Sequence, residues 1–311
     1  MRLFITGGAG CLGSNLIEYL YPQGHEFCVI ENFATGSREV LPGLPNLKLV
    51  EGSVADQALV EKLFADFAPT HVIHCAAAYK DPDDWTNDIE TNVLGSINVA
   101  RAAEASGVRQ IINLQTALCY GRPIQVPIPV DHPVAPFTSY GISKTAGEAY
   151  LLQAGVSVVS LRLANICGPR LAVGPIPTFY QRLKEGKSCF CTEAVRDFLD
   201  MSDFLRLIDQ LLEGDPVRGL YNVSTGEGRT ILEVFRAVRD YLGLDLPDAP
   251  SVPVGEDDIA EVVLDPELTR SDLGWEARVG FAEMVRHQLE WYDEHGIRSI
   301  FSHLKPPTTS A

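Results

Sequence analysis

Tyr140 and Lys144 form the strongest catalytic signal in the chain, because they lie four residues apart at the start of a predicted helix over 139–153. At this spacing, two side chains share one face of a helix. A tyrosine has an ordinary pKa of about 10 and is a poor base at neutral pH, but a nearby ammonium stabilises the phenolate and lowers that pKa. The pair therefore indicates proton transfer by Tyr140 with help from Lys144. Taken alone, such a pair is more often an ordinary surface pair.

Thr116 is the expected partner of Tyr140. It follows the apolar run 110–114, at the carboxyl end of a predicted strand. Ligands bind at this end of the strands in open α/β sheets. The Thr116 hydroxyl is able to hydrogen-bond a substrate oxygen while Tyr140 moves the proton. Threonine is common in strands, so this role depends on the partnership with Tyr140.

A glycine-rich turn near the start of the chain predicts a dinucleotide site. The apolar run 3–5 is typical of a buried strand, and a helical pattern begins at Leu12. Between them, Gly8, Gly10 and Gly13 have the spacing of the G-x-G-x-x-G fingerprint. The glycines permit a tight turn, close approach of the backbone to a pyrophosphate and close packing of helix on strand. The start of the helix then faces the phosphates.

Glu31 is the acidic residue that this fingerprint requires further along the chain. It ends a second apolar run, 27–30, at the expected distance from the glycines. Its carboxylate is placed to accept hydrogen bonds from the adenosine ribose, and it would repel a 2′-phosphate. The sequence therefore favours NAD over NADP.

Short apolar runs alternate with helical patterns in the first half of the chain, which predicts parallel βαβ units in a doubly wound sheet. The predicted strands are 2–6, 27–30, 47–50, 71–75, 110–114 and 156–163, and the predicted helices lie near 13–21, 57–67, 88–106 and 139–153. After Gly168 this alternation stops. We expect an α/β fold with a Rossmann-type NAD-binding domain over 1–167, to which a segment near 196–213 returns. A smaller substrate-binding lobe is expected over 168–311.

Composition excludes several function classes. The 311 residues have a formal net charge of −16, which disfavours nucleic acid and anionic membranes as partners. No apolar run has the length of a membrane span. Met1 leads directly into the first strand and leaves no room for a signal peptide, so we expect a cytoplasmic location. The seven cysteines are scattered without zinc-site spacing, so we expect reduced thiols and no metal.

Together these motifs resemble the extended short-chain dehydrogenase/reductases, and more narrowly the nucleotide-sugar epimerases and dehydratases related to UDP-galactose 4-epimerase. The resemblance rests on the glycine turn, the Tyr140–Lys144 pair and the stretches 161–170 and 196–198, and it extends to Trp291. It implies a homodimer and an NAD that stays bound through turnover. It also implies that Tyr140 assists hydride transfer from a sugar carbon, giving a 4-keto intermediate before hydride returns.

The resemblance further implies which residues contact the ligands. The expected catalytic residues are Thr116, Tyr140 and Lys144. The expected cofactor contacts are Gly7, Gly10, Cys11, Leu12, Glu31, Asn32, Ser53, Val54, Ala76, Ala77, Asn92, Tyr140 and Lys144. The expected contacts with a nucleotide-diphosphate sugar are Lys80, Thr116, Asn165, Arg196 and Val262.

The residues after Thr116 favour an epimerase within this family. Dehydratases and decarboxylases of the group place an acidic residue directly after the catalytic threonine or serine, whereas Ala117 and Leu118 stand here. Neither is able to transfer a proton, so chemistry beyond oxidation and reduction at one carbon lacks a catalyst. The resemblance implies that this carbon is C4 of the sugar. The alternatives are another nucleotide-sugar oxidoreductase or dehydratase of the family and, more distantly, a non-catalytic NAD-binding regulator. Regulators of this kind usually lose the tyrosine or the lysine.

Three departures from the family pattern affect the expected contacts. Ser53 stands where an aspartate usually faces the adenine. The stretch 252–258 lacks the usual diphosphate-binding arginine. Candidate replacements elsewhere in the chain are Arg170, Arg182 and Lys184. Val262 occupies the position that sets pocket size near the sugar C2 group, and its small side chain predicts room for an N-acetyl substituent.

Overall fold

The computed structural model describes residues 1–41, 43–256 and 258–297. The chain divides into two compact units that alternate along the sequence, and each is described by itself. The first unit contains Met1–Cys119, Pro136–Arg162 and Leu205–Tyr221. The second contains Tyr120–Ala135, Leu163–Phe204 and the chain from Asn222 onward. The segment near 196–213 is therefore shared, because its residues from Leu205 onward pack with the first unit.

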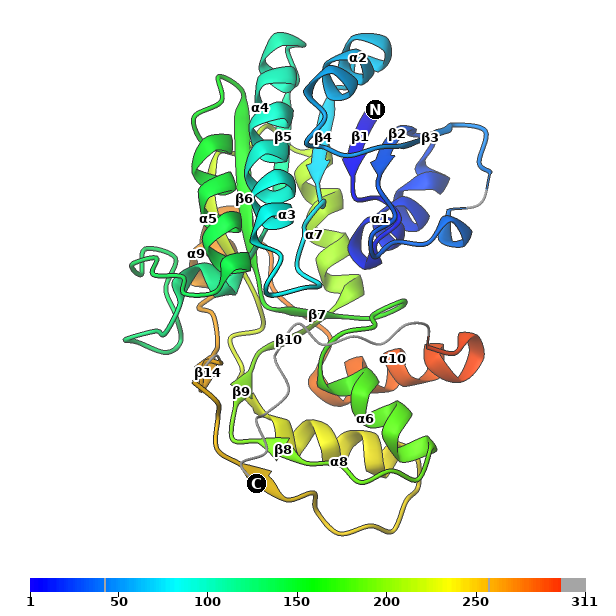
Figure 1. The fold of residues 1–311 in the computed structure, drawn as a ribbon, viewed down its shortest axis with the longest axis vertical. Helices are drawn as coiled ribbons and strands as arrows, with labels where there is room; N and C mark the ends of the chain where they lie inside the picture. Colours follow the sequence, from blue (N-terminus) through cyan, green and yellow to red (C-terminus); the bar gives the residue numbers. More distant parts are fainter. Residues whose placement is uncertain (42, 257, 298–311) are drawn as a thin grey trace. The chain divides into compact units, whose positions relative to one another are not determined.

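A seven-stranded sheet lies at the centre of the first unit (Figure 1). The last residues of two of its strands, β6 and β11, belong to the second unit. Its order is β11-β6-β5-β4-β1-β2-β3. The strands are β1 (Arg2–Thr6), β2 (Glu26–Glu31), β3 (Leu47–Glu51), β4 (His71–His74), β5 (Gln110–Thr116), β6 (Ser157–Leu163) and β11 (Gly219–Val223). β1 pairs in parallel with both β2 and β4. The strand order reverses between them, which is the switch point where doubly wound sheets bind ligands. The expected Rossmann-type fold is confirmed.

Helices cover both faces of this sheet. On one face lie α2 (Gln57–Phe67), α4 (Gly95–Ala105) and α5 (Ser139–Leu151), and Figure 1 shows α4 and α5 side by side. Their apolar residues form one core with alternate strand residues such as Phe4 and Val72. On the other face lie α1 (Cys11–Leu20) and the part of α7 (Met201–Glu213) in this unit. These two are linked by a hydrogen bond of 3.5 Å from the Tyr19 hydroxyl to Asp209.

The predicted helix over 88–106 forms as three consecutive segments. α3 (Trp85–Asp88) is followed by a wider, π-helical segment η3 (Ile89–Leu94) and then by α4. Such π-helical turns occur frequently at functional sites. α5 lies very close to this region, because a Cβ on Gly147 would stand only 2.2 Å from the carbonyl oxygen of Asn92. A side chain at position 147 would push the two segments apart.

The second unit is built from short strands and three longer helices. Its strands are β7 (Asn165–Cys167), β8 (Cys191–Thr192), β9 (Val195–Arg196), β10 (Phe198–Asp200), β12 (Arg229–Thr230), β13 (Ser251–Val252) and β14 (Glu261–Val262). Its helices beyond the start of α7 are α6 (Pro175–Lys184), α8 (Ile231–Tyr241), α9 (Glu267–Leu273) and α10 (Phe281–His295). α6, α8 and α10 share an apolar core that includes Phe179, Phe235 and Leu289.

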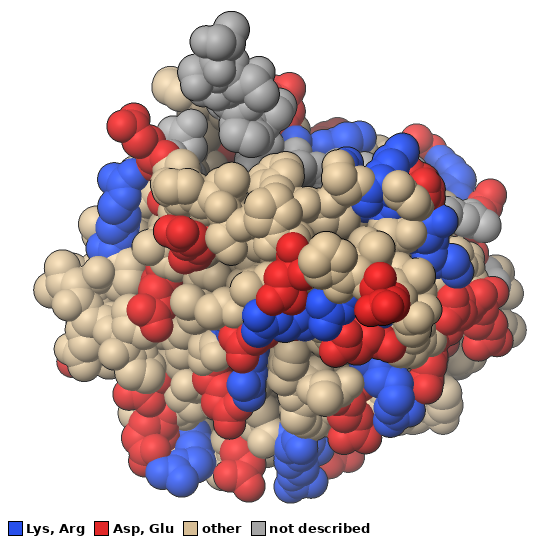
Figure 2. Space-filling model, turned by 90° about the horizontal axis from the view of Figure 1, so that it is seen from below, with Lys and Arg blue, Asp and Glu red and all other residues tan. Residues whose placement is uncertain are grey.

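Surface and cysteine chemistry are unremarkable in the part of the chain that the structure describes. Figure 2 shows acidic and basic side chains interspersed on one face rather than gathered into a basic area. None of the seven cysteines, all of them among the described residues, forms a disulfide. No described helix has the length and apolar character needed to cross a membrane. Among the same residues, no group of three or more potential metal ligands is found.

Two buried histidines on β4 predict sensitivity to acid. Burial lowers the pKa of His71 to about 4 and that of His74 to about 3 from the ordinary 6.5. Below pH 6.5 both histidines therefore bind protons in the unfolded chain. In the folded chain they stay neutral until the pH falls to about 4 for His71 and about 3 for His74. The corresponding stability is complete above pH 6.5 and is lost as the pH falls through this window.

We expect urea unfolding of the wild type to show this loss between pH 6.5 and pH 4. Over this pH range, the free energy of unfolding of His71→Leu should fall by roughly 3 kcal/mol less than that of the wild type, since one pKa unit corresponds to about 1.4 kcal/mol. A variant whose unfolding free energy changes with pH as steeply as that of the wild type would contradict the assignment.

Candidate active site

The turn between β1 and α1 brings backbone very close to backbone. Gly7 has a φ of 65°, and a Cβ there would stand 2.8 Å from backbone atoms of Ala76. A Cβ on Gly13 would stand 2.5 Å from the Gly7 carbonyl oxygen and 2.6 Å from Gly8 Cα. Gly10 is the N-cap of α1 and gives it no side-chain cap. A glycine-rich turn without a side-chain cap at a helix N-terminus fits a pyrophosphate.

Glu31, at the end of β2, hydrogen-bonds the backbone of this turn. Its side chain is buried, Oε2 accepts a hydrogen bond of 3.0 Å from the Ala9 N–H, and Oε1 accepts one of 2.9 Å from the Phe33 N–H. Arg38, the nearest candidate for a 2′-phosphate ligand, pairs with Glu51 and stacks 4.2 Å from the Phe33 ring centroid. The local charge around Glu31 therefore suits a ribose with free hydroxyls better than a phosphorylated one.

The structure brings Thr116, Tyr140 and Lys144 together around α5 and the end of β5. Thr138 caps the helix by accepting a hydrogen bond of 3.1 Å from the Gly141 N–H. The Tyr140 hydroxyl hydrogen-bonds the Thr116 side chain. One helical turn further, Lys144 Nζ donates to the Leu114 carbonyl oxygen at 2.7 Å. The two elements thus hold the tyrosine, the threonine and the lysine in one place.

Burial acts on both titratable groups in the direction that opposes charge. It raises the pKa of Tyr140 above its ordinary value, Tyr79 raises it further, and the hydrogen bond with Thr116 acts in the opposite direction. Burial also lowers the pKa of Lys144 to about 8. A tyrosine in this environment needs an additional positive charge beside it before it becomes a base at neutral pH.

Tyr79 is a site residue that the sequence analysis missed. Its ring centroid lies 6.0 Å from that of Tyr140, at an interplanar angle of 55°. Its hydroxyl hydrogen-bonds Thr35, and burial raises its pKa to about 12. Tyr79 belongs to no motif, and only its place after the predicted cofactor residues Ala76 and Ala77 could have suggested it.

Asn92 is buried, and its side chain is fully engaged within the protein. Oδ1 accepts from the Ala78 N–H at 2.9 Å, while Nδ2 donates to the Ala78 carbonyl at 3.0 Å and to Ser143 Oγ at 2.9 Å. Both amide protons are used in these contacts. Asn92 therefore acts indirectly, because it holds the Ala78 backbone in the loop after β4 and the Ser143 side chain of α5.

The remaining predicted cofactor residues of the first unit surround the ends of β1, β2, β3 and β4. The Ser53 hydroxyl accepts from the Ala55 N–H at 3.1 Å, and Val54 is buried. The Asn32 side chain turns back to its own loop, where it accepts from the Ala34 N–H at 3.0 Å. Cys11, Leu12, Ala76 and Ala77 are partly exposed, and Asn32 is exposed. Lys80, a predicted substrate residue, is exposed as well.

The predicted substrate residues of the second unit lie on neighbouring strands. Arg196 on β9 faces Val262 on β14 across a parallel pairing. The Arg196 guanidinium makes an ion pair of 2.6 Å with Asp258, and the two side chains are 16% and 20% exposed. Asn165 Nδ2 donates to the Asp197 carbonyl oxygen at 2.9 Å. Arg196 is therefore already paired with a carboxylate from the stretch in which the family's arginine is absent.

The candidate replacements for that arginine are also engaged. Arg182 donates to the Ser188 carbonyl oxygen at 2.9 Å, and Lys184 pairs with Asp293 at 3.0 Å. Arg170 adopts a left-handed backbone conformation with φ of 64° after β7. Asp257, between Glu256 and Asp258, lies outside the described residues.

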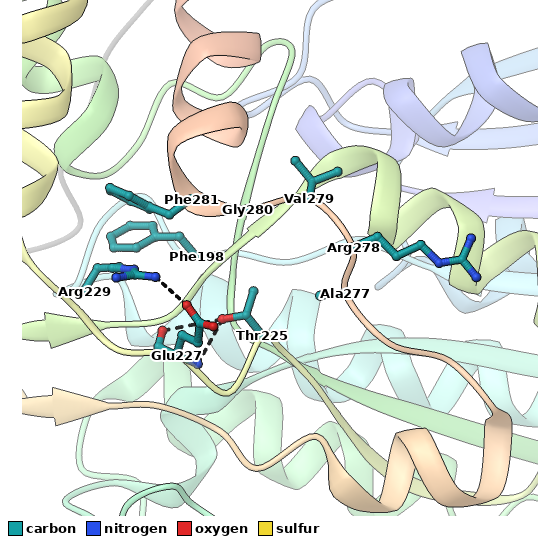
Figure 3. Close-up of a pocket in the computed structure, with 9 residues that line it drawn as sticks. All are labelled: Phe198, Thr225, Glu227, Arg229, Ala277, Arg278, Val279, Gly280 and Phe281. Carbon is teal, nitrogen blue, oxygen red and sulfur yellow. Dashed lines mark hydrogen bonds and ion pairs between the residues drawn. The ribbon is translucent and has the colours of Figure 1, made fainter.

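A cavity of about 180 Å³ lies within the second unit, next to the start of α10 (Figure 3). Its lining residues are Phe198, Thr225, Glu227, Arg229, Ala277, Arg278, Val279, Gly280 and Phe281. Figure 3 shows Arg229 paired with Glu227 beneath the two phenylalanine rings, while Arg278 points away from them. None of the predicted cofactor or substrate residues lines this cavity, so we do not assign the reaction to it.

Comparison with known proteins adds independent information. The model of the NAD dependent epimerase/dehydratase family matches residues 3–224. The Bordetella bronchiseptica enzyme WbmG in complex with NAD is 62% identical, with a TM-score of 0.93 and 98% of each chain covered. A complex of WbmG with NAD and UDP is 61% identical, with a TM-score of 0.93 and 97% of each chain covered.

Proteins named as 4-epimerases are more distant relatives. Thermus thermophilus UDP-glucose 4-epimerase in complex with NAD is 32% identical, with a TM-score of 0.85 and coverage of 95% of this chain and 100% of that chain. Corynebacterium glutamicum UDP-glucose 4-epimerase is 29% identical, and the match covers 88% of this chain and 90% of that protein.

Two glycine substitutions separate the packing role of the turn from its contact role. Gly13→Ala should lower the free energy of unfolding by roughly 1–3 kcal/mol, since its Cβ would overlap backbone. Gly10→Ala should change it by less than about 1 kcal/mol, because its Cβ meets only the Gly7 carbonyl oxygen, at 3.3 Å. Both should weaken binding of NAD, measured by calorimetry. Equal destabilisation by the two substitutions would contradict this division.

Proposed function

The chain belongs to the NAD-dependent epimerase/dehydratase family, and from this we propose that it interconverts the C4 epimers of a nucleotide-diphosphate sugar. The observation behind the proposal is the hydrogen bond between Tyr140 and Thr116, one helical turn from buried Lys144. The glycine turn that fits a dinucleotide lies in the same unit. Relatives named UDP-glucose 4-epimerase support the reaction type.

The first unit fits NAD by its own geometry. Gly7 and Gly13 permit the close backbone packing of the turn between β1 and α1, the type of turn that receives a pyrophosphate, and Glu31 ends β2 as a buried acceptor for ribose hydroxyls. Bound NAD would supply an acceptor and donor of hydride for the sugar carbon. Lys144 would hold the nicotinamide ribose. WbmG in complex with NAD supports the choice of cofactor.

Tyr140 is the proposed proton carrier. It would take the proton of the sugar C4 hydroxyl as the carbon is oxidised and return it when the carbon is reduced. Thr116 would hydrogen-bond the same oxygen. Because burial opposes the phenolate, Tyr140 becomes active only beside positive charge. The ammonium of Lys144 and the cationic nicotinamide ring would together provide that charge.

The surroundings of Thr116 favour epimerisation over dehydration. Ala117 and Leu118 follow it and offer no proton donor. Asp88 is a buried carboxylate whose charge raises the pKa of Tyr140. It accepts a hydrogen bond of 2.6 Å from the Ser139 hydroxyl. Asp88 is thereby engaged at the start of α5. A reaction confined to one carbon needs no further acid or base.

The proposed substrate contacts come mainly from the second unit. Arg196 would bind the diphosphate, and Asn165 and Lys80 would bind elsewhere on the sugar nucleotide. Val262 would leave room for an N-acetyl group at C2. The complex of WbmG with UDP supports uridine diphosphate as the nucleotide part. The division into an NAD-binding domain over 1–167 and a substrate-binding lobe over 168–311 remains a prediction.

A homodimer is also part of the proposal. Apolar side chains are exposed on two helical segments that pack against each other, η3 with α3 before it, and α5. The exposed residues are Trp85 (65%), Ile89 (58%), Leu94 (40%), Ile142 (52%) and Tyr150 (51%). Exposed apolar areas of this kind mark protein contacts. None of the seven cysteines is in a disulfide, which supports a reducing compartment, and we propose the cytoplasm.

Replacement of the phenol tests the reaction. Tyr140→Phe should retain bound NAD and lose about 10²- to 10⁴-fold in kcat, because it removes the general base. Tyr21→Phe, in the turn η1 (Tyr21–Gln23) after α1 and outside the proposed dimer surface, is the control and should keep wild-type activity. UDP-, dTDP-, GDP- and CDP-sugars, each with and without an N-acetyl group, are incubated with enzyme and the products separated. Wild-type rates in Tyr140→Phe would refute the mechanism.

Charge introduced on the exposed helices tests the dimer. Ile89→Glu should shift the protein from dimer to monomer in analytical ultracentrifugation, because it would bury a carboxylate in an apolar interface. Leu246→Glu replaces a residue of the second unit that is 45% exposed, and it should leave the mass unchanged. A wild-type protein that sediments as a monomer at micromolar concentration would exclude the dimer.

A further inference from the structure

His74 is a buried polar residue to which neither the proposed reaction nor any motif assigns a role. It ends β4, and its side chain is completely buried. Nδ1 lies 2.8 Å from Thr6 Oγ1, and Nε2 lies 3.1 Å from Ser96 Oγ. Thr6 ends β1 directly before Gly7, and Ser96 is in the first turn of α4. The ring therefore connects the start of the glycine turn to the helix after the π-helical segment.

The direction of each hydrogen bond follows from the number of protons available. Ser96 Oγ lies 2.7 Å from the Asn92 carbonyl oxygen, which only accepts, so the single Ser96 hydroxyl proton is used there. His74 must then donate to Ser96 from Nε2. Its Nδ1 remains an acceptor for the Thr6 hydroxyl. Thr6 Oγ1 in turn accepts from the Ala76 N–H at 3.0 Å.

The same series of hydrogen bonds reaches the catalytic helix. Asn92 Nδ2 donates to Ser143 Oγ at 2.9 Å, and the Ser143 hydroxyl donates to the Tyr140 carbonyl oxygen at 3.1 Å. We call Thr6, His74, Ser96, Asn92 and Ser143 the His74 network. It begins at Ala76, whose backbone packs against Gly7, and ends at the backbone of Tyr140.

Close packing leaves the network little freedom to rearrange. A Cβ on Gly147 would stand 2.7 Å from Ser96 Oγ as well as 2.2 Å from the Asn92 carbonyl oxygen, so α5 covers this junction closely. Buried polar groups that lose a partner in such a place are left unsatisfied, which costs about 1–3 kcal/mol each. The network therefore resists small shifts of α5 relative to β1 and β4.

We propose that His74, with its proton on Nε2, is a positioning residue that fixes the distance between the glycine turn and Tyr140. This inference rests on the proposed function, because the turn would hold the cofactor and Tyr140 would move the proton. Reacting groups must be placed to within a fraction of an ångström, and a displacement of 1 Å lowers rates by about 10²-fold. His74 would act through α5 and β1 without touching either ligand.

The tautomer is tested first, on the wild-type protein. Long-range ¹⁵N–¹H correlation spectra of protein labelled at its seven histidines report which ring nitrogen is protonated. The His74 signals are identified by their absence from His74→Gln. We expect the Nε2–H tautomer at neutral pH. A proton on Nδ1, or on both nitrogens, would overturn the network as described.

Two matched pairs of variants then test the positioning role. His74→Leu is compared with His71→Leu, which removes another buried histidine from the same strand, where it hydrogen-bonds Thr70 instead. Thr6→Val is compared with Thr6→Ser, because valine removes the hydroxyl and serine keeps it. For each variant we measure the folded fraction by circular dichroism, the NAD retained through gel filtration, and kcat, KM and the pH profile of kcat.

Positioning predicts a pattern that general destabilisation does not produce. His74→Leu and Thr6→Val should retain less NAD and lose about 10- to 100-fold in kcat per folded molecule, with KM changed far less. His71→Leu and Thr6→Ser should stay within about twofold of wild type. Equal kcat within each pair would overturn the proposal.

The outcome for the network is separable from that for the proposed function. If wild-type protein epimerises no sugar nucleotide, the proposed function fails. The measurements of NAD retention and of the His74 tautomer still test the His74 network in that case. If His74→Leu does not fold, the Thr6 pair decides, since loss of one hydroxyl leaves the core volume nearly unchanged. Retention of NAD by Thr6→Val equal to that by Thr6→Ser would then refute the coupling.

Discussion

A buried ion pair holds the catalytic helix against the sheet. Glu148 of α5 and Arg162 of β6 meet at 2.8 Å, with side chains only 4% and 5% exposed. Ser160 donates to the same carboxylate at 2.6 Å, and Asn113 donates to Ser160 at 2.8 Å. Buried charges are tolerated only when they are paired and hydrogen-bonded. α5 therefore has one low-energy position on β5 and β6, and the reactive side chains depend on it.

The consequence for chemistry is a tyrosine held in its neutral form. The burial that holds α5 in place also raises the pKa of Tyr140 and lowers that of Lys144 to about 8. Both effects penalise charge, so the protein alone gives little phenolate. A bound cationic ring changes this balance directly, because an opposite charge within a few ångströms favours the ionised form. Proton transfer would thus be confined to molecules that already hold their cofactor.

Charge in the second unit is arranged by pairing rather than by excess. The chain has 41 acidic and 25 basic residues, so any site for a diphosphate must depend on individual donors. Arg196 is the proposed donor, and it is held by Asp258 at 2.6 Å on a strand beside Val262. A phosphate approaching this guanidinium would have to share it with the carboxylate or displace it. Nucleotide affinity would then depend on Asp258 as well as on Arg196.

The fold and the core of the candidate site could be predicted from the sequence because local patterns are sufficient for them. Alternating apolar runs predicted β1 to β6, the glycine spacing predicted the turn, and the four-residue spacing of Tyr140 and Lys144 placed both on one face of α5. Tyr79, His74 and Asp258 could not be found in this way. They act through partners far along the chain, such as Thr6 for His74 and Arg196 for Asp258. Hydrogen-bond direction and charge pairing depend on which groups meet after burial, and only the tertiary structure decides that.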